Sequence, residues 1–263
     1  MAIQPPIRGQ PGKERRRRQH GRTQPENRFG NHFQGRRGYA FKHLDNDVCR
    51  AVINNIVIGK SYPKVELVAD VRTIVDAGGN IGVPSVYFAA LYPDARIHAF
   101  EPAPENFAML AENTKPFENI ATHEVGLFEA DKEAPLYEGE LDPLTNSVGD
   151  SGLNTGRSRM VNLRAAKPFL HGFEVDRIDI LKLDTEGCEV PILRSLEDML
   201  SAIKVVYVEC HDDEDRRVID NLLSRHHILS SADAIEPHCG ELCYVVRRAF
   251  PSESAMNQYR ITV

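Results

Sequence analysis

A glycine-rich turn directly after a β-branched run is the first place where this sequence could perform chemistry. The run Val71 to Val75 predicts a strand, and the turn Asp76-Ala77-Gly78-Gly79-Asn80-Ile81-Gly82 follows it. Glycines let the backbone turn sharply and approach a ligand closely, and a helix beginning at Val83 would present free N–H groups to that ligand. Glu101 ends the next predicted strand, where doubly wound folds bind the hydroxyls of a ribose. The spacing therefore predicts a nucleoside-cofactor site at the carboxyl edge of a parallel sheet.

The residues of this turn exclude two common nucleotide sites. Gly78, Gly79 and Gly82 do not form the Gly-x-Gly-x-x-Gly fingerprint of dinucleotide sites, and the turn lacks the Gly-Lys-Ser/Thr ending of a P-loop. Asp76 would repel a pyrophosphate but attracts a ligand with positive charge. S-adenosylmethionine carries both a sulfonium and an ammonium group, so it is the cofactor that we expect.

A second group of acidic residues follows the predicted strand Ile178 to Leu183. An alcohol keeps its proton at neutral pH, so a carboxylate within hydrogen-bond reach is needed to accept that proton when a methyl group arrives. Asp184 and Glu186 lie at the active edge of the predicted sheet and are the candidates for this role. Glu189 falls in the first turn of the next predicted helix, where the helix dipole favours a capping carboxylate.

The next predicted strand, Ile203 to Val208, brings Glu209 and His211 to the same edge. Alternation along the strand places both side chains on one face, where they could meet Asp184. Histidine is a common general base in enzymes, so His211 is a further candidate base, whereas the acids after it are better explained as a helix cap. Asp184, Glu209 and His211 are also ligand types for a divalent cation, but their spacing does not require one and no metal site is predicted.

Strands and helices alternate along the chain and would position these groups. Strands are predicted at 71–75, 95–100, 120–125, 178–183, 203–208, 228–231 and 242–247, and helices at 48–56, 83–91, 104–114, 189–200 and 213–224. This order predicts an α/β fold with a doubly wound, mainly parallel sheet covered on both faces. The short connection between the last two strands predicts that one of them is antiparallel at the edge of the sheet.

The chain is predicted to divide into three segments. Residues 1–38 contain ten basic and two acidic side chains, although the whole chain has a net charge of −6, and this composition predicts a disordered basic tail. Residues 39–69 form a helical lead-in, and residues 70–263 form the main domain with an insertion at 126–170. We expect the polar part of the insertion, residues 139–170, and the segment near Lys42 to Tyr62 to form the pocket for the acceptor.

Composition excludes several classes of protein. Hydrophobic residues make up 41% and charged residues 27% of the chain, which is ordinary for a soluble globular protein. No apolar run approaches the roughly 18 residues of a membrane span, and the first residues lack the apolar run of a secretory signal. The five cysteines lack a disulfide-like spacing, so we expect reduced thiols and a cytoplasmic location. No sequence feature indicates an oligomeric state.

Three motifs together resemble the FkbM family of S-adenosylmethionine-dependent methyltransferases. They are Val75-Asp76-Ala77-Gly78-Gly79-Asn80-Ile81-Gly82, then Ala99-Phe100-Glu101-Pro102, then Leu181-Lys182-Leu183-Asp184-Thr185-Glu186-Gly187-Cys188-Glu189. The similarity covers roughly residues 70–248 and leaves the basic tail outside. The resemblance implies a seven-stranded Rossmann-like sheet and O-methylation of a small-molecule, sugar or glycan hydroxyl.

The resemblance also implies individual roles for matching residues. Those expected around the methionine part of the cofactor are Asp76, Gly78, Asn80 and Gly82. Glu101 would hold the ribose hydroxyls, Pro102 would shape the adenine pocket, and adenine would also meet residues 125–127. Asp184 would lie beside the transferred methyl group.

Two other functions stay open. The basic tail could recruit a nucleic acid or another acidic surface, which would make the acceptor a nucleic acid on the same fold. A non-catalytic binding module with a vestigial cofactor site is the second alternative, against which the retained Asp76, Glu101 and Asp184 argue.

Overall fold

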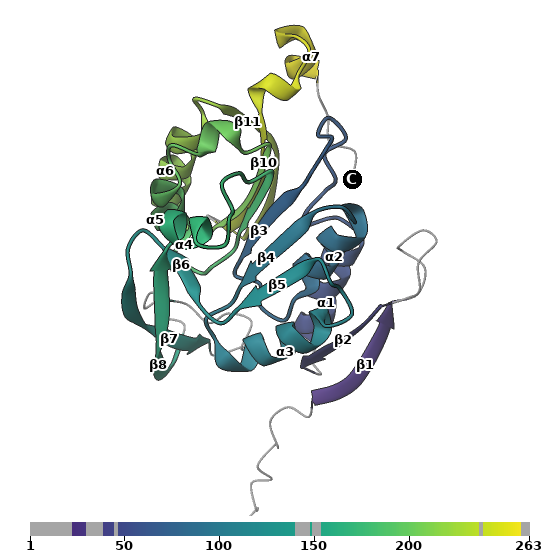
Figure 1. Ribbon diagram of the computed structural model, residues 1–263, viewed down its shortest axis with the longest axis vertical. Helices are drawn as coiled ribbons and strands as arrows, with labels where there is room; N and C mark the ends of the chain where they lie inside the picture. The colour runs from purple at the N-terminus through teal and green to yellow at the C-terminus, as the bar shows by residue number, and fades with distance from the viewer. Residues whose placement is uncertain are drawn as a thin grey trace, which may run out of the picture.

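The centre of the protein is a seven-stranded sheet (Figure 1). The computed structural model describes residues 23–29, 39–44, 47–139, 148, 154–236 and 239–258. Across the sheet the strands are β11 (His227–Glu236), β12 (Cys239–Val246), β10 (Val205–Cys210), β9 (Ile180–Leu183), β3 (Thr73–Ala77), β4 (Arg96–Phe100) and β5 (Ile120–His123). The five strands from β10 to β5 are mutually parallel. The predicted mainly parallel, doubly wound sheet is thus confirmed.

One detail of the sheet edge differs from the prediction. The antiparallel strand is β12, which pairs with β10 on one side and β11 on the other. The outermost strand is therefore β11, and it runs in the direction of the parallel strands. A short connection in the sequence between two strands indicates only their mutual direction, so it could not show which of the two lies outermost.

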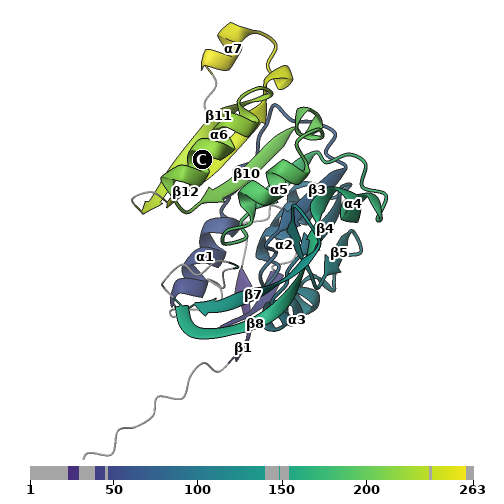
Figure 2. The same cartoon turned by 90° about the vertical axis from the view of Figure 1, so that its left-hand side faces the viewer.

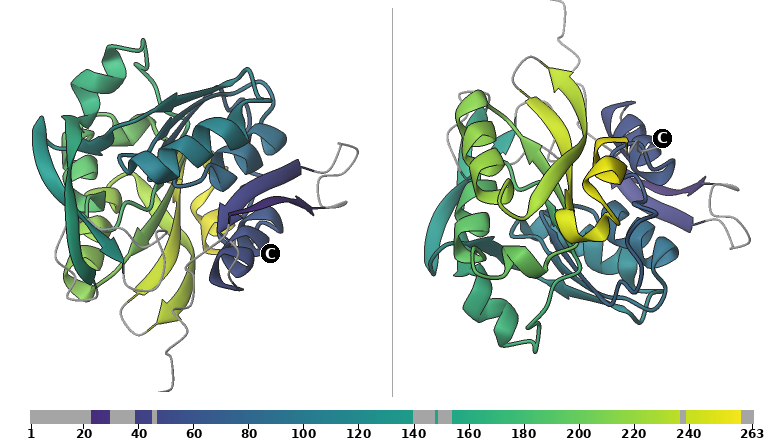
Figure 3. Two further views of the ribbon diagram at one scale, coloured as in Figure 1. Left: turned by 90° about the horizontal axis from the view of Figure 1, so that it is seen from below. Right: turned by 90° about the horizontal axis from the view of Figure 1, so that it is seen from above.

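Helices cover both faces of the sheet, and Figure 3 shows α6 and α1 on opposite sides of it. The helices are α1 (Asp47–Val57), α2 (Val83–Leu91), α3 (Pro104–Thr114), α4 (Ala166–His171), α5 (Glu189–Ser195), α6 (Asp213–Leu223) and α7 (Glu253–Gln258). Two hydrophobic cores lie on the two faces of the sheet, and neighbouring residues of β3 belong to different cores. Val75 packs in the core that contains α4, α5 and α6, whereas Ile74 packs in the core that contains α1 and α2. This explains the continuous apolar character of the central strands.

The predicted insertion forms a small sheet of its own. Its strands are β6 (Gly126–Phe128), β7 (Lys132–Gly139) and β8 (Asn154–Ala165), in the order β6-β8-β7. The β7–β8 pair is an antiparallel hairpin, as predicted from the β-prone pieces at its two ends. Figure 2 shows this hairpin across the lower part of the molecule. Apart from residue 148, the loop 140–153 lies outside the described residues.

The N-terminal segments contain more strand than predicted. β1 (Thr23–Phe29) falls within the segment expected to be disordered, and it pairs with β2 (Tyr39–Leu44) of the expected helical lead-in. β2 is fixed to α3 because the Lys42 amide donates to Asn113 Oδ1 at 2.7 Å. Such backbone pairing does not depend on a hydrophobic composition, so composition alone missed it. Residues 1–22 and 30–38 lie outside the described residues.

Within the described residues, no helix combines the length and the apolar character needed to cross a membrane.

A buried aspartate joins the amino ends of three central strands. Asp179 is 1% exposed and accepts hydrogen bonds from the backbone amides of Arg72 (2.7 Å) and Thr73 (3.1 Å). It also pairs with Lys204 at 3.2 Å, at the start of β10. Burial opposes the charge of Asp179, but the two amides and the ammonium group outweigh it and lower the pKa of the carboxyl below its usual range.

We predict that Asp179→Ala lowers the free energy of unfolding by about 2 to 3 kcal/mol, because two backbone amides and an ammonium group lose their partner. The lowered pKa means that this stabilisation is present above the unfolded-state pKa of about 3.9 and is lost as the pH falls further. Urea unfolding at pH 7 and near pH 3 measures both effects. Asp94→Ala, an exposed loop aspartate, is the control. A loss equal to that of Asp94→Ala at pH 7 would contradict the role of Asp179.

Candidate active site

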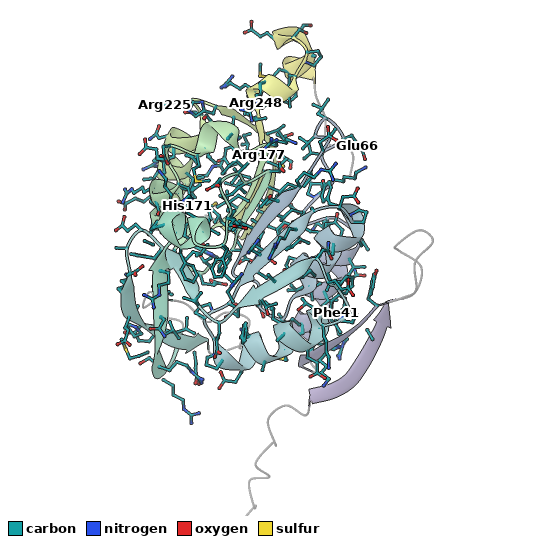
Figure 4. The ribbon with its side chains drawn as sticks, viewed as in Figure 1. Phe41, Glu66, His171, Arg177, Arg225 and Arg248 are labelled. Carbon is teal, nitrogen blue, oxygen red and sulfur yellow. The ribbon has the colours of Figure 1, made fainter. Side chains whose placement is uncertain are left out.

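A cavity of about 460 Å³ lies at the carboxyl ends of the central parallel strands. This volume falls within the range of roughly 300–1,000 Å³ that is usual for small-molecule sites. Its walls come from α1 and the segment after it, from the turns after β3, β4 and β9, from the end of β10, and from the insertion and the β11–β12 pair. The residues labelled at the upper end of Figure 4 (Glu66, Arg177, Arg225 and Arg248) lie away from it, at the amino ends of the parallel strands.

The glycine turn after β3 folds against the end of β9. Gly78 has φ 78°, and a Cβ there would lie 1.7 Å from the carbonyl oxygen of Asp184. The amides of Gly78 and Gly79 donate to the carbonyl of Phe100 at 3.0 and 2.8 Å, which ties the turn to β4. Asn80 has φ 49°, a conformation that asparagine tolerates better than most residues. Gly78 and Asn80 both line the cavity.

Two of the residues predicted to surround the cofactor do not reach the cavity wall. Gly82, with φ 90°, is the residue that precedes α2, and its backbone packs against α3. Asp76 is fully buried beneath the turn, where its Oδ2 accepts a hydrogen bond from Ser85 at 2.6 Å. Asp76 therefore supports the turn from below.

Lys182 is a buried residue that the sequence reasoning missed. Its side chain is fully buried, and its Nζ donates to the carbonyl of Gly78 at 2.5 Å. The same Nζ lies 3.2 Å from Asp76 Oδ1 and 3.4 Å from Asp184 Oδ2. Burial opposes its charge, but Asp184 and Asp76 outweigh that effect and raise the pKa of Lys182. The sequence contains one sign of this role, because Lys182 is a charged residue within the otherwise apolar strand Ile180–Leu183.

Glu101 is held at the cavity wall by the backbone. Its Oε2 accepts from the Asn80 amide at 2.9 Å and its Oε1 from the Ala103 amide at 2.8 Å. Burial raises the pKa of Glu101 to about 7, although both amides act in the opposite direction. Each carboxylate oxygen has a second lone pair, so Glu101 can also accept hydrogen bonds from a ligand.

Asp184 and Glu209 are joined at the centre of the cavity. A side-chain hydrogen bond connects them, and it favours the charged form of Asp184 and the neutral form of Glu209. Burial opposes the charge of Asp184, but Lys182 outweighs it and lowers the pKa of Asp184. Burial and the charge of Asp184 raise the pKa of Glu209 to about 10. Glu209 therefore keeps its proton at neutral pH.

Glu186 and His211 form the second pair. Glu186 has φ 56°, in the left-handed region that non-glycine residues seldom adopt, and it lines the cavity. Its Oε2 lies 3.6 Å from His211 Nε2. Burial and then the charge of Asp184 raise the pKa of Glu186 to about 7. The structure thus brings together the four predicted catalytic residues, with Glu186 facing the cavity and His211 behind it.

Glu189 has a structural role, but it binds the turn before α5 and does not cap the helix as predicted. Its Oε1 accepts from the amide and hydroxyl of Thr185 at 2.6 and 2.7 Å, and its Oε2 accepts from the Gly187 amide at 3.0 Å. These bonds close the turn that contains Glu186. Asp212 caps α6 in the predicted way, because its side chain accepts from the Asp215 amide.

The walls beyond these carboxylates differ in character. Near Glu101 the wall is apolar and includes Pro102, Gly126, Leu127 and Leu163. On the side of α1, Val48 and Val52 are 53% and 43% exposed and line the cavity. The lead-in and the insertion therefore both contribute residues to the cavity wall.

The cavity fits S-adenosylmethionine by the chemistry of its lining. Glu101 offers carboxylate oxygens for ribose hydroxyls, the apolar wall with Leu127 and Pro102 suits a flat base, and Asp184 offers negative charge to a cationic centre. In the part of the chain that the structure describes, no group of three or more His, Cys, Asp or Glu is arranged to hold a metal ion.

Comparison with known proteins points to one family. The family described as the methyltransferase FkbM domain matches residues 76–237. Methyltransferase 1 of Beauveria bassiana is 31% identical over 54% of this chain and 65% of its own length. Hexuronic acid methyltransferase AglP of Haloferax volcanii is 26% identical, over 57% of this chain and 60% of its own. 2-O-methyltransferase NoeI of Sinorhizobium fredii is 22% identical, over 54% and 64%. The chain thus spans less than two thirds of these relatives' length.

We predict that Glu189→Ala lowers the free energy of unfolding by about 2 kcal/mol, because three donors of the turn at 185–187 lose their acceptor. The turn that holds Glu186 should loosen as well. Thermal unfolding and amide hydrogen exchange at residues 185–187 measure the two effects.

The matched control is Glu214→Ala, which removes an exposed glutamate from the first turn of α6. Equal stability of the two variants, with unchanged exchange at the turn, would contradict a structural role for Glu189.

Proposed function

Because the chain belongs to the FkbM family of methyltransferases, we propose that it transfers a methyl group from S-adenosylmethionine to a hydroxyl of a sugar, glycan or other small molecule. One observation carries this proposal. A single cavity joins the carboxylate of Glu101, suited to a ribose, with the carboxylates of Asp184 and Glu186, suited to a methyl-transfer centre. A hexuronic acid and a 2-O position, named for two relatives, support a hydroxylated acceptor.

S-adenosylmethionine, when bound, supplies an electrophilic methyl group on a sulfonium centre. Glu101 would accept hydrogen bonds from the ribose hydroxyls, and Leu127 and Pro102 would pack against the adenine. Asp184 stays ionised because Lys182 is beside it, and its charge favours the cationic end of the cofactor. The turn at Gly78 lets the backbone reach that end. These residues bind the cofactor and orient its methyl group, and such positioning is a large part of how an enzyme accelerates an in-line transfer.

Glu186 is the residue best suited to accept the proton of the acceptor hydroxyl. A general base works best when its pKa lies near the operating pH, and the pKa of Glu186 is raised to about 7. Glu209 already carries a proton at neutral pH and so cannot act as the base, while Asp184 is a weak base because its pKa is lowered. His211, 3.6 Å from Glu186, would then pass the proton toward solvent.

The charge of the acceptor side favours a neutral or cationic small molecule over a nucleic acid. Glu209 and Glu241 are directly opposite each other on β10 and β12, and both line the cavity. Asp233 lines it too and already pairs with Lys60 at 3.2 Å. Among the described residues of this wall, a phosphate backbone would find no uncompensated positive charge, because Lys60 is already paired with Asp233. The segment proposed to recruit nucleic acid, Arg15 to Arg18, lies outside the described residues.

We predict that the protein binds S-adenosylmethionine and that the affinity falls as the pH drops below about 7, because protonated Glu101 is a poorer acceptor for the ribose hydroxyls. Glu101→Gln should bind at least tenfold more weakly at pH 8 and lose this pH dependence, since one hydrogen bond to a charged group contributes about 1.5–3 kcal/mol. Calorimetric titration between pH 6 and 8.5 measures both. Absence of binding by a folded wild-type protein would reject the methyltransferase proposal and favour the vestigial module.

We also predict that Glu186→Gln lowers turnover about 100-fold with an acceptor found by screening, because the base is lost. The rate of the wild type should rise as the pH passes through about 7, as Glu186 ionises. Cofactor affinity should stay within threefold.

Glu209→Gln is the matched control, because glutamine resembles the protonated carboxyl group that Glu209 already carries, and its loss should stay under tenfold. The assignment of the base would be wrong if Glu209→Gln were the inactive variant and Glu186→Gln the active one.

A further inference from the structure

Tyr62 lies outside the matched family domain and contacts the carboxylate of Asp184. It follows α1 in the lead-in, whereas the family match begins at residue 76. Its hydroxyl donates to Asp184 Oδ2 at 3.3 Å, and its side chain lines the cavity. No sequence motif singled it out, because the two residues are 122 positions apart.

Two donors meet the same carboxylate oxygen. Lys182 Nζ lies 3.4 Å from Asp184 Oδ2, on which the Tyr62 hydroxyl also acts. Lys182 comes from within the sheet and Tyr62 from the lead-in, so the carboxylate is fixed between two separate elements. Burial and then the charge of Asp184 raise the pKa of Tyr62 well above its usual value. The phenol therefore keeps its proton and acts as a donor.

Tyr62 is itself held in place. Its ring packs against Phe88 of α2 and Tyr207 of β10, with centroids 5.7 and 5.6 Å away. Its carbonyl accepts a hydrogen bond from Tyr87 at 2.8 Å, and the next carbonyl, of Pro63, accepts one from Tyr207 at 2.6 Å. A side chain ordered to this degree loses little entropy when it orients a neighbour.

We propose that Tyr62 is a positioning residue for methyl transfer, which fixes the orientation and charge of Asp184 and links it to the acceptor-side wall. The proposal rests on the proposed function for its catalytic meaning. The same lead-in supplies Val52 and Asn55 to that wall.

Several other groups face Asp184 and contribute to its titration. They are Lys182 on its own strand, Glu186 in the turn after it, Glu209 and His211 on β10 and beyond, Asp76 through Lys182, and Glu241 on β12. Tyr62→Phe leaves all of these in place, so it isolates the phenol hydroxyl. The readout is the carboxyl ¹³C resonance of Asp184 in protein labelled with [4-¹³C]aspartate, assigned by its disappearance in Asp184→Asn.

The experiment is a pH titration of this resonance in the protein without ligand. Loss of one hydrogen bond to the charged carboxylate should raise the lower apparent pKa of the Asp184–Glu209 pair by roughly one to two units. Tyr244→Phe is the matched control. It removes another buried tyrosine hydroxyl that donates to an aspartate, Asp220, at 2.5 Å, and it should leave the Asp184 resonance unchanged. An unchanged titration in Tyr62→Phe would overturn the proposal.

A second variant tests the proposal if Tyr62→Phe does not fold. Incorporation of 3-fluorotyrosine at position 62 keeps the ring and makes the phenol a stronger donor, so the pKa of Asp184 should fall. A rise or no change there would also overturn the proposal. Calorimetric binding of S-adenosylmethionine to the wild type, measured in parallel, distinguishes failure of the proposed function from failure of the Tyr62 assignment.

Discussion

The buried ammonium group of Lys182 is the interaction on which the site depends. It lies beneath the floor of the cavity and binds the carbonyl of Gly78, the carboxylate of Asp76 and the carboxylate of Asp184. The first two belong to the glycine turn after β3 and the third to the proposed methyl-transfer centre, so one charge sets the geometry of both. Removing one partner of such a buried pair leaves an uncompensated charge, which typically costs 3–5 kcal/mol. The pairing therefore makes the two halves of the cavity a single unit.

The charges around this unit separate the protonation states of the three carboxyl groups Asp184, Glu186 and Glu209. Lys182 keeps Asp184 ionised, and the ionised Asp184 in turn favours the neutral forms of Glu209 and Glu186. The pKa is raised more at Glu209, which shares a hydrogen bond with Asp184, than at Glu186, which lies beside His211. Similar residue types thus receive different protonation states from their positions alone, which is a common feature of catalytic sites.

The sequence could predict the parts of the site that are local in the chain. The glycine turn, Glu101 and the acids after β9 and β10 each follow a strand directly, and parallel strands bring such positions to one edge. Lys182 and Tyr62 could not be assigned in this way, because their partners lie far along the chain. The direction of Asp76 was also hidden: a strand-end aspartate can face the ligand or support the turn, and only its bond to Ser85 shows which. β1 depends on backbone pairing with β2, which its Arg-rich surroundings concealed.

A crystal structure with S-adenosylhomocysteine would show whether one cavity holds the cofactor at Glu101 and the methyl-transfer centre at Asp184. We expect density for the adenine between Leu127 and Pro102, the ribose hydroxyls within hydrogen-bond distance of Glu101, and the sulfur directed toward Asp184 and Glu186. Density at another place, or an empty cavity in crystals grown at a saturating concentration, would contradict this expectation.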